Sequence, residues 1–361
     1  MGKKREKATD DIRQAVAAVR KKNKKSTMGM ASEMLKAPGV WVSFGAMSLD
    51  RVARGRNPGG VPSGPTQGRI SHIAGAWSTG KSLILDHLFK SVQEIGGVAV
   101  CSETEATRDP HFANVIGLDL DELVLGQPET IEAAFQEFMD WHEDFRKRNK
   151  LKPVIWGIDS LDSTEAARTA DASLNQTGLF EYGGGRSKAL GNCLRKFTNR
   201  ICNHHPTTLV MLNQTRDKIG VMFGDKKTTP GGNPPHFYAS LEIQLKIGPK
   251  GDIRGPYSGA KLTKEQKHRL GMRVTDRGDV IGRWIRAKIT KNKLTGTYGQ
   301  EADFYLSFSK GVNRWAGLLQ RMLHEGKVDL KGDKIQHGDL SFNTEKEWVR
   351  WLSVNQKELT K

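Results

Sequence analysis

The sequence predicts an α/β fold whose central sheet is twisted and mostly parallel, and three observations lead to this prediction. Short apolar segments, typical of buried strands, alternate with amphipathic helical segments between residues 69 and 212. A glycine-rich octet at 75–82 separates the first of these strands from the helix that follows it. After residue 239 apolar and polar residues alternate, which is typical of antiparallel strands. With 361 residues, the chain can form one large domain with small additions.

The octet has the spacing G-x-x-x-x-G-K-S of a phosphate-binding loop and lies between a strand at 69–74 and a helix at 82–95. Glycines let such a loop turn tightly, so that its backbone N–H groups face phosphate oxygens at the start of the helix. The lysine adds a charge for the outer phosphates, and the serine hydroxyl can ligate Mg²⁺. The alternative is a chance match in a glycine-rich chain, and the flanking strand and helix argue against it. The predicted nucleotide-binding residues here are Gly75, Ala76, Trp77, Ser78, Thr79, Gly80, Lys81 and Ser82.

The segments after the octet continue the alternation of strand and helix. Strands are predicted at 98–101, 154–158 and 208–212, because each is a short and uninterrupted apolar run. Helices are predicted at 129–148 and 188–204, and the first of these carries its apolar residues on one face. Strands joined through helices form βαβ units, which place the strands parallel to one another in one sheet.

The two ends of the chain differ from this pattern. Strands at 241–247, 284–289 and 304–308 are predicted to add a partly antiparallel portion to the sheet. The helix-forming and polar residues from 314 onward predict a small cap. Residues 8–22 are alanine-rich with one apolar stripe and predict a helix that cannot bury a core alone. Docking on another surface and a disordered tail are both possible for it, and the stripe favours docking.

The charge balance indicates a polyanionic partner, because 57 Lys and Arg against 40 Asp and Glu give a net charge of +17. A protein that is basic without such a partner is the plainer alternative. Cys101, Cys193 and Cys202 are odd in number and lack C-x-x-C spacing, which argues for a reducing compartment and against zinc or a disulfide framework. No run of about 18 apolar residues and no secretory signal are present, so we expect no membrane association.

Acidic residues follow two of the predicted strands. They lie at the edge of the sheet where the strand before the phosphate loop also ends. Asp159 stands where P-loop NTPases hold Mg²⁺ and its water, together with Ser82. The alternative role for Asp159 is to cap a helix. Glu103 and Glu105 follow the strand at 98–101, and a carboxylate there can reach the water that attacks the γ-phosphate. We predict Glu105 as this base, with Glu103 in support.

Gln214 closes the strand at 208–212, where a polar side chain can sense the γ-phosphate. The segment 215–231 behind it is long, basic and contains glycines, with apolar residues between the charges. A loop of that length inside a compact domain is functional or disordered. Basic residues interleaved with apolar ones suit a groove for single-stranded nucleic acid, and the segment 175–186 is a second candidate of this kind.

Several segments together resemble the RecA family of homologous-recombination ATPases. The most selective are NQTRDKIGVMFG at 213–224, TTPGGN at 228–233 and FYAS at 237–240. Further matching segments are SFGAMSLD at 43–50, DP at 109–110, GQP at 126–128 and KNK at 291–293. The resemblance covers roughly residues 40–315 and implies a RecA-like P-loop NTPase core.

The resemblance implies roles for individual residues. Glu105 matches the catalytic glutamate of the family, and Gln214 matches the glutamine that links the γ-phosphate to a DNA-binding loop. Phe112 lies where the family stacks an aromatic ring, usually tyrosine, on adenine. Lys291 and Lys293 match a lysine pair that reaches the ATP of a neighbouring subunit. The implied DNA-binding residues are Arg195, Arg216, Lys218, Ile219, Gly220, Gly231, Gly232 and Asn233.

The resemblance also implies three parts of the chain. These are a basic helical oligomerisation arm at 1–36, an ATPase core with both DNA loops at 37–315, and a small C-terminal domain at 316–361. The stretch 249–282 is longer and more basic than the bacterial pattern, and an added DNA contact and a solvated loop are equal alternatives for it. An acidic C-terminal tail is missing, and this compact, divergent form indicates a phage or mobile-element recombinase.

The function predicted from the sequence is a DNA-dependent ATPase that uses ATP and Mg²⁺ in homologous recombination and repair. We expect it to polymerise as a helical filament on single-stranded DNA and to pair this strand with double-stranded DNA. The expected location is the cytoplasm, with the nucleoid or in a phage-infected cell. The alternatives are a mediator that binds DNA without exchanging strands, and a hexameric helicase built on the same core.

Overall fold

The computed structural model describes residues 2–24, 26, 28–30, 41–54, 68–105, 108–163, 185–217, 227–254 and 280–355. It divides into two compact units, residues 1–39 and 40–361. The first unit contains helix α1 (Gly2–Lys22), which confirms the predicted helix and extends it toward the N-terminus. Within this unit Arg20 Nε donates a hydrogen bond to the carbonyl of Met28. The apolar stripe of α1 is open to solvent, since Ile12 is 55% and Val19 is 39% exposed.

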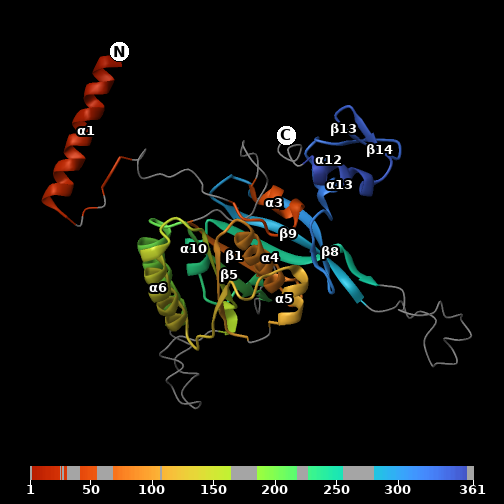
Figure 1. Ribbon diagram of the computed structural model, residues 1–361, viewed down its shortest axis with the longest axis horizontal. Helices are drawn as coiled ribbons and strands as arrows, with labels where there is room; N and C mark the ends of the chain where they lie inside the picture. The colour runs from red at the N-terminus through yellow and green to blue at the C-terminus, as the bar shows by residue number, and fades with distance from the viewer. Residues whose placement is uncertain are drawn as a thin grey trace, which may run out of the picture. The chain divides into compact units, whose positions relative to one another are not determined.

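A nine-stranded sheet is the centre of the second unit (Figure 1). Its strand order is β11-β10-β9-β8-β1-β5-β4-β2-β3. The six strands from β8 to β3 are parallel to one another, and β9, β10 and β11 continue the sheet in antiparallel fashion. The predicted change from parallel to antiparallel pairing after residue 239 is therefore confirmed.

The bounds of the strands follow the predicted segments closely up to β5, and β8 and β9 extend well beyond the segments predicted for them. The parallel strands are β1 (Ile70–Gly75), β2 (Val98–Glu103), β3 (Leu123–Gly126), β4 (Val154–Asp159), β5 (Thr207–Gln214) and β8 (Leu241–Arg254). The antiparallel strands are β9 (Val280–Asn292), β10 (Glu301–Ser307) and β11 (Gly311–Asn313). The edge strand β3 was not predicted, because its residues are half-buried or exposed.

One face of the sheet is covered by α3 (Met47–Arg54), α4 (Lys81–Glu94) and α5 (Pro110–Ile116), which share an apolar core with the strands. The other face is covered by α6 (Ile131–Arg148) and α9 (Gly185–Phe197), around a second core that contains Trp156 and Phe135. Alternate strand residues point to opposite faces, so Ile73 of β1 lies in the first core and Ile70 in the second.

Several local signals explain where the helices begin and end. The Thr130 side chain accepts a hydrogen bond from Ala133 N at the start of α6, and Asp109 does the same for His111 N at the start of α5. The helix predicted at 188–204 is α9 followed by one π-helical stretch, Thr198–Cys202. Cys101, Cys193 and Cys202 are free and buried, as small apolar residues are.

The C-terminal part forms a small module on a third core, which includes Met47 of α3, Leu318 and Trp348. Its elements are α12 (Leu318–His324), the three-stranded sheet of β12 (Asp329–Lys331), β13 (Lys334–His337) and β14 (Leu340–Phe342), and α13 (Glu345–Val354). The residues from 314 onward predicted a small cap of helix-forming and polar segments, without strands. The three strands have three or four residues each, mostly exposed, and therefore leave no alternation long enough to read.

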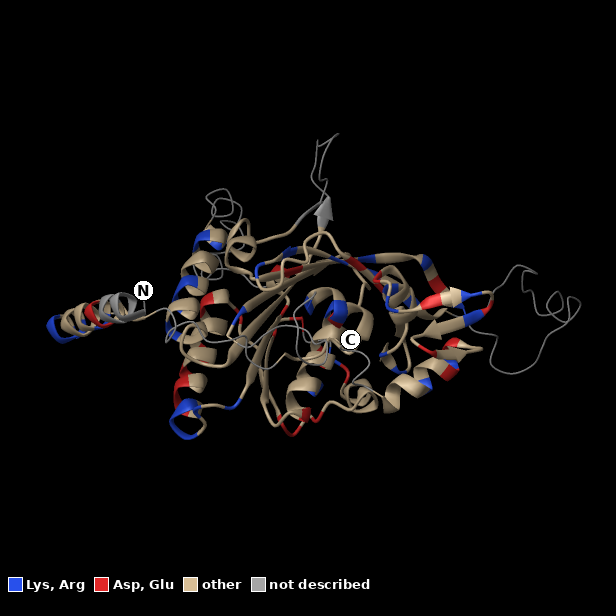
Figure 2. Cartoon of the chain, turned by 90° about the horizontal axis from the view of Figure 1, so that it is seen from above, with Lys and Arg blue, Asp and Glu red and all other residues tan. Residues whose placement is uncertain are grey.

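Charged side chains of both signs are interspersed over the described elements, as Figure 2 shows. None of the described helices combines the length and the apolar composition that crossing a bilayer requires.

Candidate nucleotide and DNA site

The phosphate loop connects β1 directly to α4, as the sequence predicted. Gly80 precedes α4 with a φ of 78° and a ψ of 26°, a left-handed conformation that favours glycine. A Cβ at Gly75 would lie 2.6 Å from Thr79 Oγ1 and 3.0 Å from the carbonyl oxygen of Leu245. Thr79 Oγ1 itself donates to the carbonyl of Ala76 at 2.8 Å and ties the loop together. The loop is therefore held in a tight turn at the N-terminus of α4, where backbone dipoles favour an anion.

Lys81 is the first residue of α4 and folds back over the loop. Its Nζ donates to the carbonyl oxygens of Gly75 at 3.1 Å and Ala76 at 3.0 Å. Burial lowers the pKa of Lys81, while the charges of Asp159 and Glu105 raise it. The cationic head therefore lies between the phosphate loop and the acids at the neighbouring strand ends.

Asp159 and Ser82 are brought together across two elements. Asp159 is the last residue of β4, is buried, and shares a side-chain hydrogen bond with Ser82. Burial raises the pKa of Asp159, and the bond with Ser82 and the charge of Arg108 lower it. A carboxylate and a hydroxyl are the oxygen donors that Mg²⁺ prefers, so this pair fits the ion in kind.

Glu103 and Glu105 occupy different environments at the end of β2. Glu103 pairs with Asp159 in the register of β2 and β4, is buried, and accepts a hydrogen bond from Arg108 N at 2.9 Å. Its carboxylate also lies 3.6 Å from Arg108 Nε. Glu105 is exposed and accepts a hydrogen bond from Ser160 Oγ at 2.7 Å. Glu103 is thus part of a buried ion pair, whereas the Glu105 carboxylate lies at the surface beside the end of β4.

Neither the partner of Arg108 nor that of Trp77 was predicted from the sequence. Arg108 also forms an ion pair with Asp86 on α4, so it links α4 to the end of β2. A basic residue after a strand gives no sequence signal for this bridge. Trp77 is a bulky residue in the phosphate loop. It is 78% exposed, and it also donates from its indole Nε1 to Gln214 Oε1 at 2.7 Å.

The contact between Trp77 and Gln214 follows from strand pairing. β1 and β5 are parallel neighbours, and Gly75 is opposite Gln214 in their register. Thr215 N then donates to the carbonyl of Gly75 at 3.1 Å. The phosphate loop and the start of the segment 215–231 therefore leave the sheet side by side, at one edge.

The ends of the segment 215–231 are joined as a two-stranded ribbon, in which β6 (Arg216–Asp217) pairs with β7 (Lys227–Thr228). Lys218, Ile219 and Gly220 lie outside the described residues, as does 175–184 of the other predicted DNA loop. For Arg216 the structure gives the backbone position in β6 only.

The remaining predicted DNA-contact residues gather where α9 meets α10 (Pro234–Tyr238). Gly231 and Gly232 have φ values of 90° and 68°, and a Cβ at Gly232 would lie 2.7 Å from Ser187 Oγ on α9. Asn233 directly precedes α10 and is exposed. Arg195 is exposed on α9, where its guanidinium donates to Asn192 Oδ1 at 2.8 Å. The ends of both predicted DNA loops thus converge on α9.

Phe112 lies on α5, half-buried, and packs against the same core as α4. Its stacking on adenine stays a prediction.

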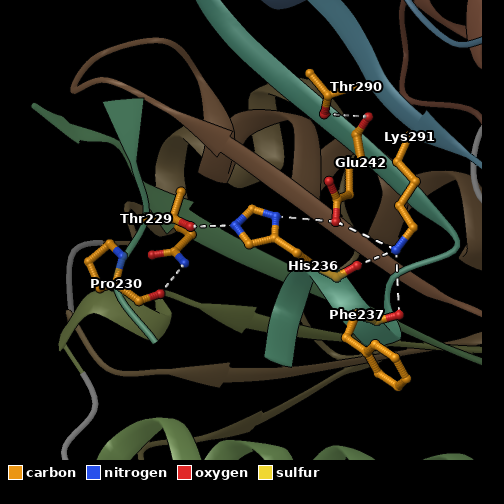
Figure 3. A network of polar contacts seen from close by, with 8 residues as sticks. Thr229, Pro230, His236, Phe237, Glu242, Thr290 and Lys291 are labelled. Atoms are coloured by element: carbon orange, nitrogen blue, oxygen red, sulfur yellow. Dashed lines mark hydrogen bonds and ion pairs between the residues drawn. The ribbon is translucent and has the colours of Figure 1, made fainter. Parts of the chain in front are cut away.

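Lys291 and Lys293 lie at the end of β9, away from the phosphate loop of their own chain. Lys291 Nζ donates to the carbonyl oxygens of His236 and Phe237, the latter at 3.4 Å, and lies 4.0 Å from Glu242 Oε1 (Figure 3). Burial and the charge of Lys293 lower the pKa of Lys291, while Glu242 raises it. Lys293 follows β9 and donates its backbone N–H to the carbonyl of Ser240 at 2.8 Å.

The strand register shows how far Lys291 lies from the sheet edge at which the phosphate loop begins, here called the nucleotide edge. Glu242 is opposite Lys291 on β9 and opposite His72 on β1. Gly75, where the phosphate loop begins, is three residues further along β1, which is about 10 Å in a strand. Lys291 therefore lies back from the nucleotide edge of its own chain.

Comparison with known proteins gives one family. The family model for the RecA N-terminal domain matches residues 10–266. "Protein RecA" of Kineococcus radiotolerans is 31% identical over 328 residues, covering 91% of this chain and 81% of that protein. "Protein RecA" of Leptospira meyeri is 30% identical over 353 residues, covering 96% and 80%. "Protein RecA" of Clostridium acetobutylicum is 28% identical over 306 residues, covering 85% and 76%.

Proposed function

This chain belongs to the RecA family, and we propose that it is a DNA-dependent ATPase that forms filaments on single-stranded DNA and catalyses homologous pairing and strand exchange. The observation that carries the proposal is the shared sheet edge of the phosphate loop and the segment 215–231. Trp77 and Gln214 connect the two directly, at 2.7 Å. Only Thr215 separates Gln214 from β6, the first strand of the ribbon in the proposed DNA loop. A nucleotide-dependent shift of Gln214 would therefore move this loop directly.

In the proposed site the phosphate loop and Lys81 bind the phosphates of ATP, and Ser82 and Asp159 hold Mg²⁺. Bound ATP with Mg²⁺ supplies the phosphoryl group that water attacks. Glu105 accepts the proton of that water, and the hydroxyl of Ser160 orients its carboxylate at 2.7 Å. Glu103 supports this arrangement from the buried side, because its ion pair with Arg108 fixes the end of β2.

The DNA-binding surface is proposed on the two loops that converge on α9. Its residues are Arg195, Arg216, Lys218, Ile219, Gly220, Gly231, Gly232 and Asn233. The arginines and the lysine neutralise phosphates, and the glycines let the DNA backbone approach closely. Binding of this kind is strongly salt-dependent, with a slope of log K against log salt of about −0.7 per phosphate contact for single strands.

Lys291 and Lys293 are proposed to act on the ATP of a neighbouring copy in the filament. A charge supplied across an interface stabilises the transition state only after assembly, as an arginine finger does. The position of Lys291 back from its own phosphate loop supports this role. Helix α1, with its exposed apolar stripe, is proposed as the arm that docks on the next copy. The location in the cytoplasm and a phage origin belong to the same proposal.

Electron microscopy of the full chain with ATP and single-stranded DNA tests the assembly, and a strand-exchange assay with homologous double-stranded DNA tests the reaction. We expect helical filaments that depend on ATP, and exchange that depends on homology. Closed six-membered rings that unwind duplexes would instead identify a helicase. Filaments without exchange, in the presence of normal ATP hydrolysis, would identify a mediator.

A further inference from the structure

Three polar residues form a row across the middle of the sheet. His72 of β1 is opposite Glu242 of β8, and Glu242 is opposite Lys291 of β9. Residues that are opposite one another in neighbouring strands project to the same face, so all three side chains share the face that carries the second core. His72 and Glu242 are both buried there, with 1% and 8% of their surfaces exposed.

Helix α10 adds a second imidazole to this row. The ring of His236 meets the ring of His72 edge-on, with 5.1 Å between their centroids. His236 Nδ1 lies 3.3 Å from Glu242 Oε1, and its Nε2 lies 3.0 Å from Thr229 Oγ1 (Figure 3). The ligand atoms of His72, His236 and Glu242 all lie within 4.8 Å of one another.

One ring nitrogen of His72 has no partner within the described part of the chain. This nitrogen, Nε2, is buried. The pKa of His72 is lowered to about 3, mostly by burial and in addition by the charges of His236 and Lys291. The ring is therefore neutral at physiological pH and offers a lone pair, as a metal ligand must.

We propose that His72, His236 and Glu242 bind a divalent transition-metal ion of the Zn²⁺ class, and that the ion competes with Lys291 for the Glu242 carboxylate. Two imidazoles and a carboxylate are one of the three-ligand sets that proteins use for Zn²⁺, and imidazole nitrogen is disfavoured by Mg²⁺ and Ca²⁺. Tetrahedral ligands at 2.0–2.1 Å are about 3.3 Å apart, so the three ligand atoms must draw together modestly on binding. His236 can move, because its side chain is 46% exposed and α10 has only five residues.

The surroundings of His236 suit this role. In the proposed complex Nδ1 of His236 faces the ion, as it now faces Glu242, and Nε2–H donates to Thr229 Oγ1. An acceptor on the second ring nitrogen fixes the tautomer and the orientation of a ligating histidine. Water can take the fourth position of the ion from the exposed side of α10.

The position of Lys291 affects how tightly the site binds the ion. Its ammonium lies 4.0 Å from Glu242 Oε1, on the same carboxylate that the ion requires. The two cations repel one another and share one anion, so each must weaken the binding of the other. Binding of the ion would thus weaken the attraction between Glu242 and Lys291, while the hydrogen bonds from Lys291 to the carbonyls of His236 and Phe237 remain.

The test is a calorimetric titration of the full chain with Zn²⁺, after removal of metals with a chelator and in the absence of nucleotide and DNA. Excess Mg²⁺ is present throughout, so that oxygen sites such as Ser82 and Asp159 do not contribute. We expect one Zn²⁺ per chain, and Co²⁺ in its place should give the absorption bands of a tetrahedral site. His236→Gln and Glu242→Gln should each weaken binding about tenfold or more. His204→Gln, at an exposed histidine away from the row, should leave the affinity unchanged.

Two lysine variants test the competition. Lys291→Met should tighten Zn²⁺ binding severalfold, because the competing charge is removed. Lys288→Met, at an exposed lysine of the same strand, should not change the affinity. Circular dichroism confirms that each variant is folded. The site is refuted if the wild-type chain binds no Zn²⁺ or if both ligand variants retain full affinity. Unchanged affinity in folded Lys291→Met refutes the competition.

Discussion

The nucleotide edge and the row His72–Glu242–Lys291 hold polar groups in different ways. At the edge, one short loop between β1 and α4 carries the groups proposed to bind phosphate, and the left-handed conformation of Gly80 helps to fix its shape. In the row, each residue comes from a different strand, and only the register brings them together. The first arrangement therefore depends on local sequence and the second on the whole sheet. Variants at the two places should therefore differ in size and in kind of effect.

The largest effect is expected at the loop itself. Lys81→Ala should reduce ATP hydrolysis by on the order of 10³-fold, because the lysine stabilises charge that develops in the transition state. The fold should remain intact, since Lys81 Nζ contacts only loop carbonyls in the described structure. Steady-state ATPase assays on single-stranded DNA and a thermal melt measure the two quantities. Normal turnover in a well-folded Lys81→Ala protein would contradict the assigned role.

A similarly large effect at Lys291 and Lys293 should have a different signature. The double variant Lys291→Ala/Lys293→Ala should bind ATP and hydrolyse it about 10²-fold or more slowly, because the charge supplied across the interface is lost. Mixed with Lys81→Ala protein, it should regain activity, since some interfaces then pair an intact phosphate loop with intact lysines.

The assay for this pair is the ATPase rate against mixing ratio on excess single-stranded DNA. A maximum at intermediate ratios distinguishes a shared site from a site within one chain. Lys288→Ala in place of the double variant is the matched control and should give no such maximum. If the two variants co-assemble and the rate of each mixture equals the sum of their separate rates, the shared-site proposal is wrong.

A smaller effect is expected where the edge meets the DNA loop. Gln214→Ala should leave ATP binding intact, since Lys81 and Ser82 remain. It should weaken the tightening of DNA binding by ATP by about 5- to 150-fold, the usual range of coupling between two sites. Fluorescence anisotropy with labelled single-stranded DNA, with and without ATP, measures the coupling. If ATP tightens DNA binding fully in this variant, Gln214 is only a polar residue at a strand end.

The same comparison explains what the sequence could and could not predict. The positions of the octet at 75–82 and of the acids at the ends of β2 and β4 were predicted, because a motif and a strand end are both local features. Neither β3 nor the small C-terminal sheet was predicted, since their exposed residues carry no apolar period. His72 and Glu242 stood in correctly predicted strands, but only the register of β1 with β8 places one beside the other.

The roles of the site residues divide along the same line. The positions of Lys81, Ser82 and Asp159 could be inferred from spacing and strand order, and the structure brings these three together. The hydrogen bond between Trp77 and Gln214 depends on the pairing of β1 with β5, which the sequence analysis did not predict. It was missed because a variable loop position carries no signal for its partner.

The smallest effect is expected at this bond, and it gives the finest test of the comparison. Trp77→Phe keeps an aromatic ring and removes only the indole N–H that donates to Gln214 Oε1. A hydrogen bond contributes about 0.5–1.5 kcal/mol. The conformation in which Gln214 contacts Trp77 should lose that much stability relative to conformations in which Gln214 has moved away. If Gln214 must leave Trp77 to act on the DNA loop, DNA binding without nucleotide should tighten by about 2- to 10-fold.

The double variant Trp77→Phe/Gln214→Ala shows whether the gain in DNA affinity depends on the hydrogen bond between Trp77 and Gln214. Once Gln214 has lost its amide, removing the indole N–H should have no further effect on DNA affinity, because the two changes share one interaction. The measurement is the affinity for labelled single-stranded DNA of the wild type, both single variants and the double variant at one salt concentration. Additive changes would show that Trp77 acts on DNA by another route, for example as an exposed ring for base stacking. A non-additive cycle would establish that the phosphate loop reaches the DNA loop through one side-chain contact.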